Sequence, residues 1–483
     1  MTKTSVLDLS ALDQAAAVAA GDLHARELVE ESLARAERAQ GLLGPFAHLD
    51  SERALAAAEA AGSDPAGAGQ LGGVPYAVKD LALACAGMPL TCGSRLFGDH
   101  LPDYDSAAAA RPKAAGMAVI GSTVSAEFGL YPVTEPGRFG VVRNPWSPEH
   151  TPGGSSGGAA AAVAAGVLPL AGASDAGGSI RIPAACCGLV GLKPSRGRVS
   201  LGPDMGDHFL ACEGVVSRTV ADTAAMLDVL AGPETGDASW APPPERPFAE
   251  AVNSRNGARL RIGLIMEPPI EVAVDERHRA AATRVGGLLA GLGHEVEEVD
   301  PFWRNPELPD LFGGLWGVGA AAFAGWGTMV SGLEPGPDTL DPLTLAFAAR
   351  GGAVPAPAYA GLVMALQGYA RAVVAAGSRW DAILSPALAQ RPPAVGALDG
   401  LTDPEEALAR MLAFTPFTPL ANVTGQPAIS LPAGIADDGM PLAVQLTGRP
   451  LGEATLLHLA AELERTGAWD QSLRPPAYAG VAG

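Results

Sequence analysis

Two short glycine-rich segments, each carrying serine, constrain this chain more than any other part of its sequence. The first is 151–158 (TPGGSSGG) and the second is 175–183 (DAGGSIRIP). Glycine allows backbone conformations that are closed to other residues, so both segments favour tight turns. The chain therefore presents serine hydroxyl groups twice on glycine-rich backbone, at Ser155 and at Ser179.

Upstream, a single lysine, Lys79, closes the apolar run 73–79 (GVPYAVK). A serine hydroxyl is a poor nucleophile until a base removes its proton, and lysine can be that base only when its amine is neutral. Burial lowers the pKa of a lysine because it disfavours the ammonium form. Lys79, Ser155 and Ser179 are therefore candidates for a nucleophilic site that needs no histidine. Without the two serine segments, a solvated Lys79 or one paired with Asp80 would be the simpler interpretation.

The residues before Ser179 suggest which serine attacks. Gly177 and Gly178 allow backbone N–H groups to converge where a carbonyl oxygen becomes an oxyanion. We expect Ser179 to be the nucleophile, and the amides of Ala176, Gly177, Gly178 and Ser179 to form the oxyanion hole. The alternative is a glycine-rich turn satisfied by local hydrogen bonds.

Asp175 and Arg181 bracket this turn. We expect them to pair with each other or with nearby backbone and to hold the turn rigid, because preorganised donors need a fixed support. A solvated surface pair is the alternative.

The composition sets the frame. The chain has 483 residues, of which 48% are hydrophobic and 17% charged, so a large core is available. The formal net charge of −20 argues against binding nucleic acid or an anionic membrane, both of which favour basic surfaces. The five cysteines are too few and too irregularly spaced for a disulfide framework, which favours a reducing cytoplasm.

Membrane segments are not expected. No window reaches roughly 18 consecutive apolar residues, and no apolar stretch follows Lys3 as it would in a signal peptide. We therefore expect a cytoplasmic protein with no membrane partner and no nucleic-acid partner; the sequence leaves monomer and homodimer both open.

Alternating periodicities predict an α/β fold, a large mixed β-sheet surrounded by α-helices. We expect one domain over 1–483. Its parts are N-terminal helices in 1–65, a catalytic core in 66–232, an exposed Pro-rich connection in 233–258, and a second half in 259–470. Within that half, residues 300–380 are rich in Gly, Ala, Trp and Phe with weak periodicity.

The aromatic residues of segment 300–380 include Trp316 and Trp326. Helices that pack on the core through these rings are the simpler interpretation of each residue. Together they suggest an apolar substrate pocket, and a substrate preference unchanged by substituting Trp316 and Trp326 would count against it.

The lysine, the GGSSGG segment and the GGSIR turn together resemble the amidase signature family. Further blocks resemble it in the same order along the chain: 144–146 (NPW), 188–194 (GLVGLKP), 217–222 (SRTVAD) and 424–432 (TGQPAISLP). Blocks 411–415 (MLAFT) and 439–441 (GMP) are similar to those of nylon-oligomer hydrolases and aryl acylamidases within the family. The resemblance covers nearly the whole chain.

The resemblance implies a serine hydrolase that cleaves amide C–N bonds through an acyl-enzyme and uses no cofactor. It implies a proton relay from Ser179 through Ser155 to Lys79, with Ser155 at a cis peptide bond, and Ser156 as a neighbour that supports the loop. Anilides, linear amides, urethanes and esters are all candidate substrates. One departure is Ser122 and Val124, where the family often has lysine and asparagine; Val124 suggests a more apolar substrate site.

Other functional hypotheses fit the sequence less well. Residues 154–158 match the Gly-x-Ser-x-Gly nucleophile elbow around Ser156. The candidate bases for such a site are His208, His278, His294 and His458. However, an elbow needs a strand immediately before it, and a loop broken by prolines precedes this motif. Ala159 and Ala160 follow where a phosphate loop needs Lys and Ser or Thr. No metal-ligand spacing occurs, so no metal is expected. A subunit of the amidotransferase A type, dependent on partner chains, remains the alternative function.

Overall fold

The computed structural model describes residues 5–63, 69–253 and 258–483. Its centre is a mixed sheet in the order β4-β6-β5-β10-β11-β9-β7-β8. The first six strands of this order pair antiparallel, and β9, β7 and β8 pair parallel. The strands are β4 (Leu170–Asp175), β5 (Val190–Lys193), β6 (Cys212–Ser217), β7 (Arg261–Leu264), β8 (Glu295–Glu298), β9 (Ala382–Pro386), β10 (Ala428–Ile435) and β11 (Pro441–Gly448). The expected large mixed sheet is confirmed.

A second, smaller sheet was not expected. It has the order β1-β3-β2, formed by β1 (Phe46–Leu49), β2 (Pro75–Lys79) and β3 (Ala118–Thr123). The sequence did not indicate that β2 and β3 pair with β1 apart from the main sheet. Strand periodicity reports the burial of each strand and not its partner, so this separation could not be foreseen. The small sheet packs on the main one where β2 contacts β4.

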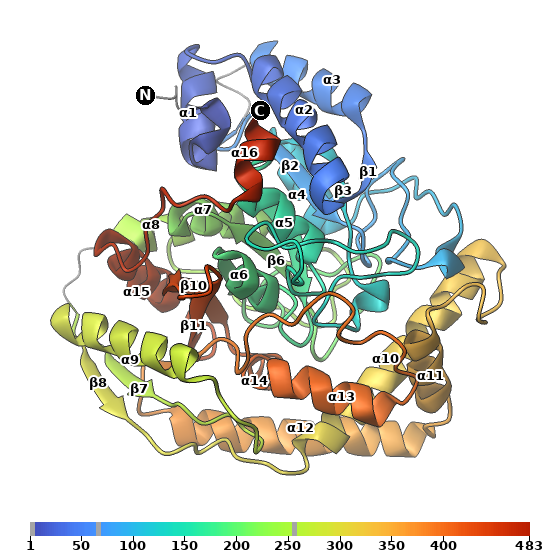
Figure 1. Ribbon diagram of the computed structural model, residues 1–483, viewed down its shortest axis with the longest axis vertical. Coiled ribbons are helices and arrows are strands. Elements are labelled where there is room, and N and C mark those ends of the chain that lie inside the picture. Colours follow the sequence, from blue (N-terminus) through green and yellow to red (C-terminus); the bar gives the residue numbers. More distant parts are fainter. Residues whose placement is uncertain (1–4, 64–68, 254–257) are drawn as a thin grey trace.

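Helices cover both faces of the main sheet (Figure 1). On one face lie α5 (Gly157–Ala164) and α6 (Arg181–Cys187), in which every residue is buried. The other face carries α7 (Val220–Leu230), α9 (Glu276–Gly291) and α15 (Glu453–Arg465). Alternate strand residues supply the two cores, as in β6, where Val215 belongs to one and Val216 to the other.

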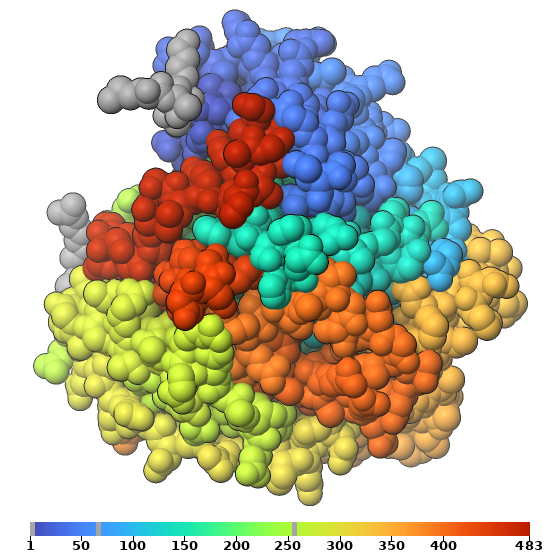
Figure 2. Space-filling view, viewed as in Figure 1, coloured from blue at the N-terminus to red at the C-terminus, as the bar shows by residue number. Residues whose placement is uncertain are grey.

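The N-terminal helices form one end of the molecule. They are α1 (Ala11–Ala20), α2 (Ala25–Leu43) and α3 (Ser51–Ser63), and α16 (Ala477–Ala482) packs on α2. Figure 2 shows this red C-terminal segment lying against the blue N-terminal helices. The helix α4 (Ala107–Ala114) precedes β3.

The 233–258 segment differs in part from its expectation. It contains the short helix α8 (Phe248–Asn253), whose Phe248 and Val252 are buried, and its last residues 254–257 lie outside the described part of the chain. Phe248 explains the difference, because its ring packs into the main core and its amide donates to Asp228. The connection is therefore partly anchored.

The weakly periodic segment 300–380 is helical. It forms α10 (Leu308–Ser331), α11 (Pro342–Gly352) and α12 (Ala356–Gly377), and α13 (Pro404–Phe414) and α14 (Pro419–Thr424) lie against it at the end of the molecule away from α1–α3 (Figure 1). By length and composition α12 could cross a membrane, and 11% of its apolar window is buried. Counting consecutive apolar residues missed it, because Gln367 and Arg371 interrupt a run that is apolar on average.

Candidate active site

Lys79 is the last residue of β2 and its side chain is fully buried. Its Nζ lies 2.8 Å from Ser155 Oγ and 3.0 Å from Ser174 Oγ, and 3.5 Å from the Ser174 carbonyl oxygen. Ser174 belongs to β4, so the packing of β2 on β4 delivers the amine to the serine loop. An Asp80-paired or solvated lysine does not describe this site, because Asp80 instead accepts hydrogen bonds from Thr91.

The surroundings of Lys79 favour its neutral form. Burial lowers its pKa from 10.5 to about 7, although the negative charges of Glu213 and Asp175 act in the opposite direction. A neutral amine has a lone pair that can accept a proton. The buried position thus supplies the property that a base requires near neutral pH.

Ser155 stands in the loop just before α5. The peptide bond between Gly154 and Ser155 is cis, as the family resemblance implied. A Cβ on Gly154 would lie 2.5 Å from the Tyr131 oxygen and 2.6 Å from the Val133 nitrogen, so only glycine fits there. Ser156 is the residue just before α5, and its hydroxyl donates to the Ser174 oxygen over 3.3 Å instead of capping the helix. Ser156 therefore anchors the loop to β4.

Ser179 comes from the second loop, just before α6. It lines one cavity together with Ser155 and Ser174, and its carbonyl oxygen accepts a hydrogen bond from the Ser156 amide over 3.3 Å. The fold therefore brings together Lys79, Ser155 and Ser179, three residues from separate segments.

The amides of the second loop divide into two groups. Those of Ala176, Gly177 and Ser179 have no acceptor among residues 5–63, 69–253 and 258–483. The amide of Gly178 donates to Asp175 Oδ1 over 2.8 Å, so it is already engaged. The four-amide oxyanion hole expected from the sequence is thereby reduced to three free amides. The reason is the turn itself, in which Gly178 has a φ of 132° and points its N–H back at the carboxylate.

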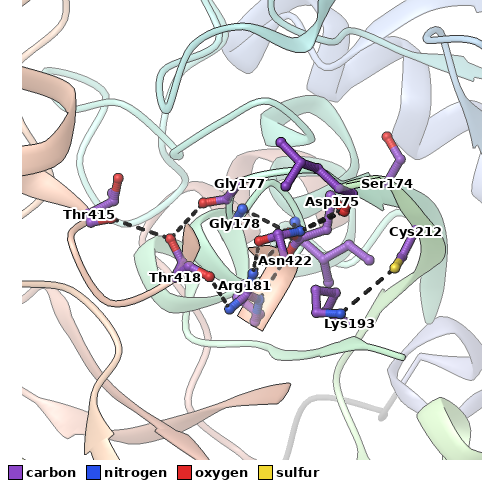
Figure 3. A network of polar contacts seen from close by, with 12 residues as sticks. Ser174, Asp175, Gly177, Gly178, Arg181, Lys193, Cys212, Thr415, Thr418 and Asn422 are labelled. Atoms are coloured by element: carbon purple, nitrogen blue, oxygen red, sulfur yellow. Dashed lines mark hydrogen bonds and ion pairs between the residues drawn. The ribbon is translucent and has the colours of Figure 1, made fainter. Parts of the chain in front are cut away.

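A buried polar network holds this turn (Figure 3). Asp175, the last residue of β4, accepts two hydrogen bonds from the Arg181 guanidinium, at 2.9 and 3.0 Å, and both side chains are fully buried. Arg181 also donates to the Thr418 oxygen, to Gln445 and to Asn422. Asn422 in turn donates to the Asp175 side chain and to its carbonyl oxygen. A solvated surface pair is thus excluded.

The network also fixes the charge of Asp175. Burial alone would raise the pKa of its carboxyl, but the Arg181 guanidinium and the donated hydrogen bonds bring it down to about 2. The carboxylate stays ionised at neutral pH and is fully occupied as an acceptor. Asp175 is therefore placed where it can support the turn, with both of its carboxylate oxygens engaged as acceptors.

The cavity beside the serines has a volume of about 210 Å³. Its walls are mostly apolar and come from the loops after β2 and β3 and from α10. The apolar residues include Leu81, Phe128, Leu130, Met205, Leu210, Leu315, Trp316 and Phe323. The expected apolar pocket from segment 300–380 is present here.

Two aromatic residues of that segment have different positions. Trp316 lines the cavity, stacks on Phe312 and donates to the Leu130 oxygen over 3.0 Å. Trp326 lies behind the wall, where it packs edge-on against Phe97 and near Phe323. The expectation that both rings face the substrate is therefore wrong for Trp326, because one helix face cannot present residues ten positions apart equally.

Val124 does not face the cavity either. Its side chain is buried among Val142 and Ala161, and its backbone pairs with Pro45 and Gly158. The more apolar substrate site inferred from Val124 is therefore not supported at this position. The apolar character of the cavity comes instead from α10, from the loops after β2 and β3 and from the segment before β6.

The histidine alternatives lack contact with the serines. His208 lines the cavity, but its Nδ1 accepts from the amides of Leu210 and Ala211. The other three histidines contact groups elsewhere. His278 is hydrogen-bonded to the Gln390 carbonyl oxygen, and His294 and His458 both contact the Glu462 carboxylate. Within the described residues no group of three or more His, Cys, Asp or Glu side chains could hold a metal ion.

Some residues of the site carried no signal in the sequence. Ser174 accepts a hydrogen bond from Lys79. Its position next to Asp175 is the only feature of the sequence that could have indicated this contact. Asn422 lies on α14, far along the chain, and completes the hydrogen-bond network of Asp175 and Arg181. A single asparagine outside any motif gives no indication of such a role in the sequence. Glu213 lines the cavity from β6. Alternation in β6 could have placed Glu213 on one face, but not against the serines.

Known proteins share this architecture. The family model described as Amidase matches residues 27–457. The 6-aminohexanoate-cyclic-dimer hydrolase of Pseudomonas sp. strain NK87 is 36% identical over 478 residues, which cover 94% of each chain.

Solved structures agree. A 6-aminohexanoate cyclic dimer hydrolase complexed with substrate has a TM-score of 0.92 at 33% identity and covers 98% of this chain and 99% of its own. A bacterial aryl acylamidase of the amidase signature family has a TM-score of 0.87 at 26% identity, with 98% of each chain covered. The chain therefore belongs to the amidase signature family, and it is an enzyme that hydrolyses amide C–N bonds.

Proposed function

We propose that the chain is a self-sufficient serine amidase in which Ser179 is acylated with the help of a Ser155–Lys79 relay. The observation that carries the proposal is the 2.8 Å contact between Lys79 Nζ and Ser155 Oγ, beside a cavity that Ser155 and Ser179 share. The lowered pKa of Lys79 supports its role as the base.

In the first step Ser179 Oγ adds to the carbonyl carbon of the substrate. The Ser179 proton moves to Ser155 Oγ while the Ser155 proton moves to Lys79 Nζ, so the amine becomes an ammonium group. The carbonyl oxygen becomes an oxyanion, and the free amides of Ala176, Gly177 and Ser179 donate to it. These amides are preorganised because Asp175 and Arg181 fix the turn.

In the second step the C–N bond breaks. The proton held on Lys79 returns through Ser155 to the leaving nitrogen, which departs as a neutral amine. The acyl group remains as an ester on Ser179. Water then attacks the ester with the same relay as base, which releases the acid and restores the serine.

The cavity favours acyl or amine groups that are largely apolar, such as aryl or linear aliphatic chains. Carbamates share the carbonyl and the leaving nitrogen with amides, and esters offer a better leaving group, so both belong to the proposed range. We expect amides to be the main class, since the relay in this site can protonate an amine as it leaves.

The test is release of 4-nitroaniline from paired short-chain anilide and carbamate substrates by the purified chain, with Ser179→Ala as the control. Turnover that vanishes in the control supports the proposal and ranks amides against urethanes. Absence of turnover by the isolated chain, with activity regained only when partner chains are added, would instead favour a subunit of the amidotransferase A type.

A further inference from the structure

Glu213 is a carboxyl group inside the catalytic cavity that the mechanism above does not use. It lies in β6 directly opposite Ser174 of β4 in the antiparallel register. Residues that face each other across such a pair point to the same side of the sheet. The Glu213 side chain therefore lies on the same face as the Ser174 hydroxyl that binds Lys79, and it lines the cavity with Ser155 and Ser179.

This carboxyl is buried and lacks a partner. Glu213 is 6% exposed, and no residue in the described part of the chain donates a hydrogen bond to it or forms an ion pair with it within 4.0 Å. The other cavity carboxylate, Asp175, is saturated by Arg181 and Asn422. The Glu213 oxygens are not among the fully enclosed unpaired atoms of the described residues, so the carboxyl opens into the cavity and is available to a group bound there.

The walls around Glu213 offer no other explanation. The cavity is mainly apolar, and side chains such as Leu210, Met205 and Phe323 line it together with Glu213. In such surroundings a hydrogen bond between substrate and protein is stronger than in water, and an unmet group is costly. A small number of well-placed polar groups in an otherwise apolar pocket is the usual means of fixing the orientation of a ligand.

We propose that Glu213 is a specificity-determining residue that binds an N–H donor group of the substrate, so that preferred substrates carry a second amide or an amine besides the scissile amide. This inference rests on the proposed amidase function and names its substrate class. Purely hydrocarbon acyl or amine groups fill the cavity but leave the carboxyl unpaired.

The protonation state of Glu213 separates the two donor classes. Burial raises the pKa of its carboxyl, the Lys79 charge lowers it and the Asp204 charge raises it, and the net pKa is about 8. Below pH 8 a neutral carboxyl both donates to a carbonyl oxygen and accepts from an N–H, which matches an amide group. Above pH 8 the carboxylate matches an ammonium group, which persists to about pH 10.

The experiment compares three 4-nitroanilides of equal chain length: hexanoyl, 6-acetamidohexanoyl and 6-aminohexanoyl. A second series carries the same three end groups on the amine side of the scissile bond, with products separated by chromatography. For the wild-type chain we expect kcat/KM for one N–H-bearing member to exceed that of the hydrocarbon member by about 10- to 100-fold. The acetamido member leads at pH 7, and the amino member gains as pH rises through 8.

Two variants test whether Glu213 causes the preference for N–H-bearing substrates. Glu213→Leu keeps the volume and removes both polar atoms, so the ratio of N–H-bearing to hydrocarbon substrate should fall to about 1. Glu213→Gln keeps one acceptor and one donor, so it should retain part of the acetamido preference and lose the amino preference. Glu135→Gln is the matched control, since Glu135 is a partly buried carboxyl outside the cavity that accepts from the Gly396 amide.

The outcomes are distinct. A wild-type ratio near 1 in both series overturns the inference and leaves the amidase proposal intact, because hydrocarbon anilides are still cleaved. A preference for N–H-bearing substrates that survives in both Glu213 variants also overturns the inference. An equal loss of kcat/KM on all substrates, with a shifted pH profile, overturns it too, because it would mean that Glu213 acts only through Lys79. Absence of any Ser179-dependent cleavage would instead be a failure of the amidase proposal.

Discussion

The serine loops and the helical wall that faces them are built in opposite ways. The loop around Ser179 is tied by the fully buried Asp175–Arg181 pair and by hydrogen bonds that reach Asn422 on α14. The wall formed by α10 and α12 packs through half-buried aromatic rings, and its outer side exposes large apolar residues such as Met329 (75%) and Met364 (67%).

The difference separates two tasks. A directed polar network fixes the position of each donor, which is what stabilisation of an oxyanion requires. Apolar contacts are not directional, so a wall of Leu, Phe and Trp can change shape with little effect on the chemistry. Changes in the loops should therefore act on the rate, and changes in the wall on the choice of substrate.

The largest effect is expected from removing the base. Lys79→Met keeps the length of the side chain but loses the proton acceptor, so kcat should fall by about 10⁴-fold or more. Steady-state kinetics on an anilide would measure it. Lys113→Met, at a partly exposed salt bridge with Asp105, is the control and should keep full activity. A loss below tenfold for Lys79→Met would mean that another group takes the proton.

Asp175→Asn should damage both stability and rate. It leaves the Arg181 charge buried without its counter-charge, and breaking a buried ion pair in this way costs about 3–5 kcal/mol of unfolding free energy. The turn would also loosen, and kcat should fall by about 10²-fold in molecules that remain folded.

Urea unfolding and kinetics below the transition would measure both effects of Asp175→Asn. Glu30→Gln, at the exposed pair with Arg26, should change stability by less than about 1 kcal/mol. Full activity in Asp175→Asn would remove the supporting role of the network.

Substitutions in the wall formed by α10 and α12 should change the selectivity between substrates. Trp316→Ala enlarges the cavity, so the ratio of kcat/KM for bulky to small anilides should change by about tenfold, with kcat for the best substrate changed less. Trp326→Ala is the matched control because its ring lies behind the wall, and the ratio should change by less than about twofold. Equal shifts in both variants would contradict the separation of cavity wall and backing layer.

The smallest effect is the dependence on pH. In the proposed mechanism the neutral form of Lys79 is the active one, and its pKa is lowered to about 7, so kcat/KM for a hydrocarbon anilide should rise with pH through 7 and level off above it. Between pH 7 and pH 6 the value should fall by about fivefold, which follows from a single titration at that pKa. A profile that falls as pH rises through 7 would contradict a lysine base.

Much of the site could be predicted from the sequence, because its residues sit in short local patterns. Lys79, Ser155, Ser179 and the Asp175–Arg181 bracket are all recognisable in this way. What escaped prediction depends on distant pairing: Asn422 comes from a helix without any motif, and Glu213 reaches the cavity only through the register of β6 with β4. The separate small sheet escaped for the same reason.

The family resemblance and the local pattern each misled once. The resemblance placed Val124 near the substrate, but its side chain packs into an unrelated cluster. The Gly178 amide belongs to the right turn and yet points at Asp175. Direction within a turn is set by dihedral angles that composition does not specify.

The most direct test of the account is covalent labelling of the nucleophile. The purified chain would be treated with a fluorophosphonate, digested, and the modified peptide sequenced by mass spectrometry, with Ser179→Ala and Ser155→Ala in parallel. The account predicts an adduct on Ser179, absent in Ser179→Ala and strongly slowed in Ser155→Ala. An adduct on Ser155 or Ser156 that persists in Ser179→Ala would contradict it.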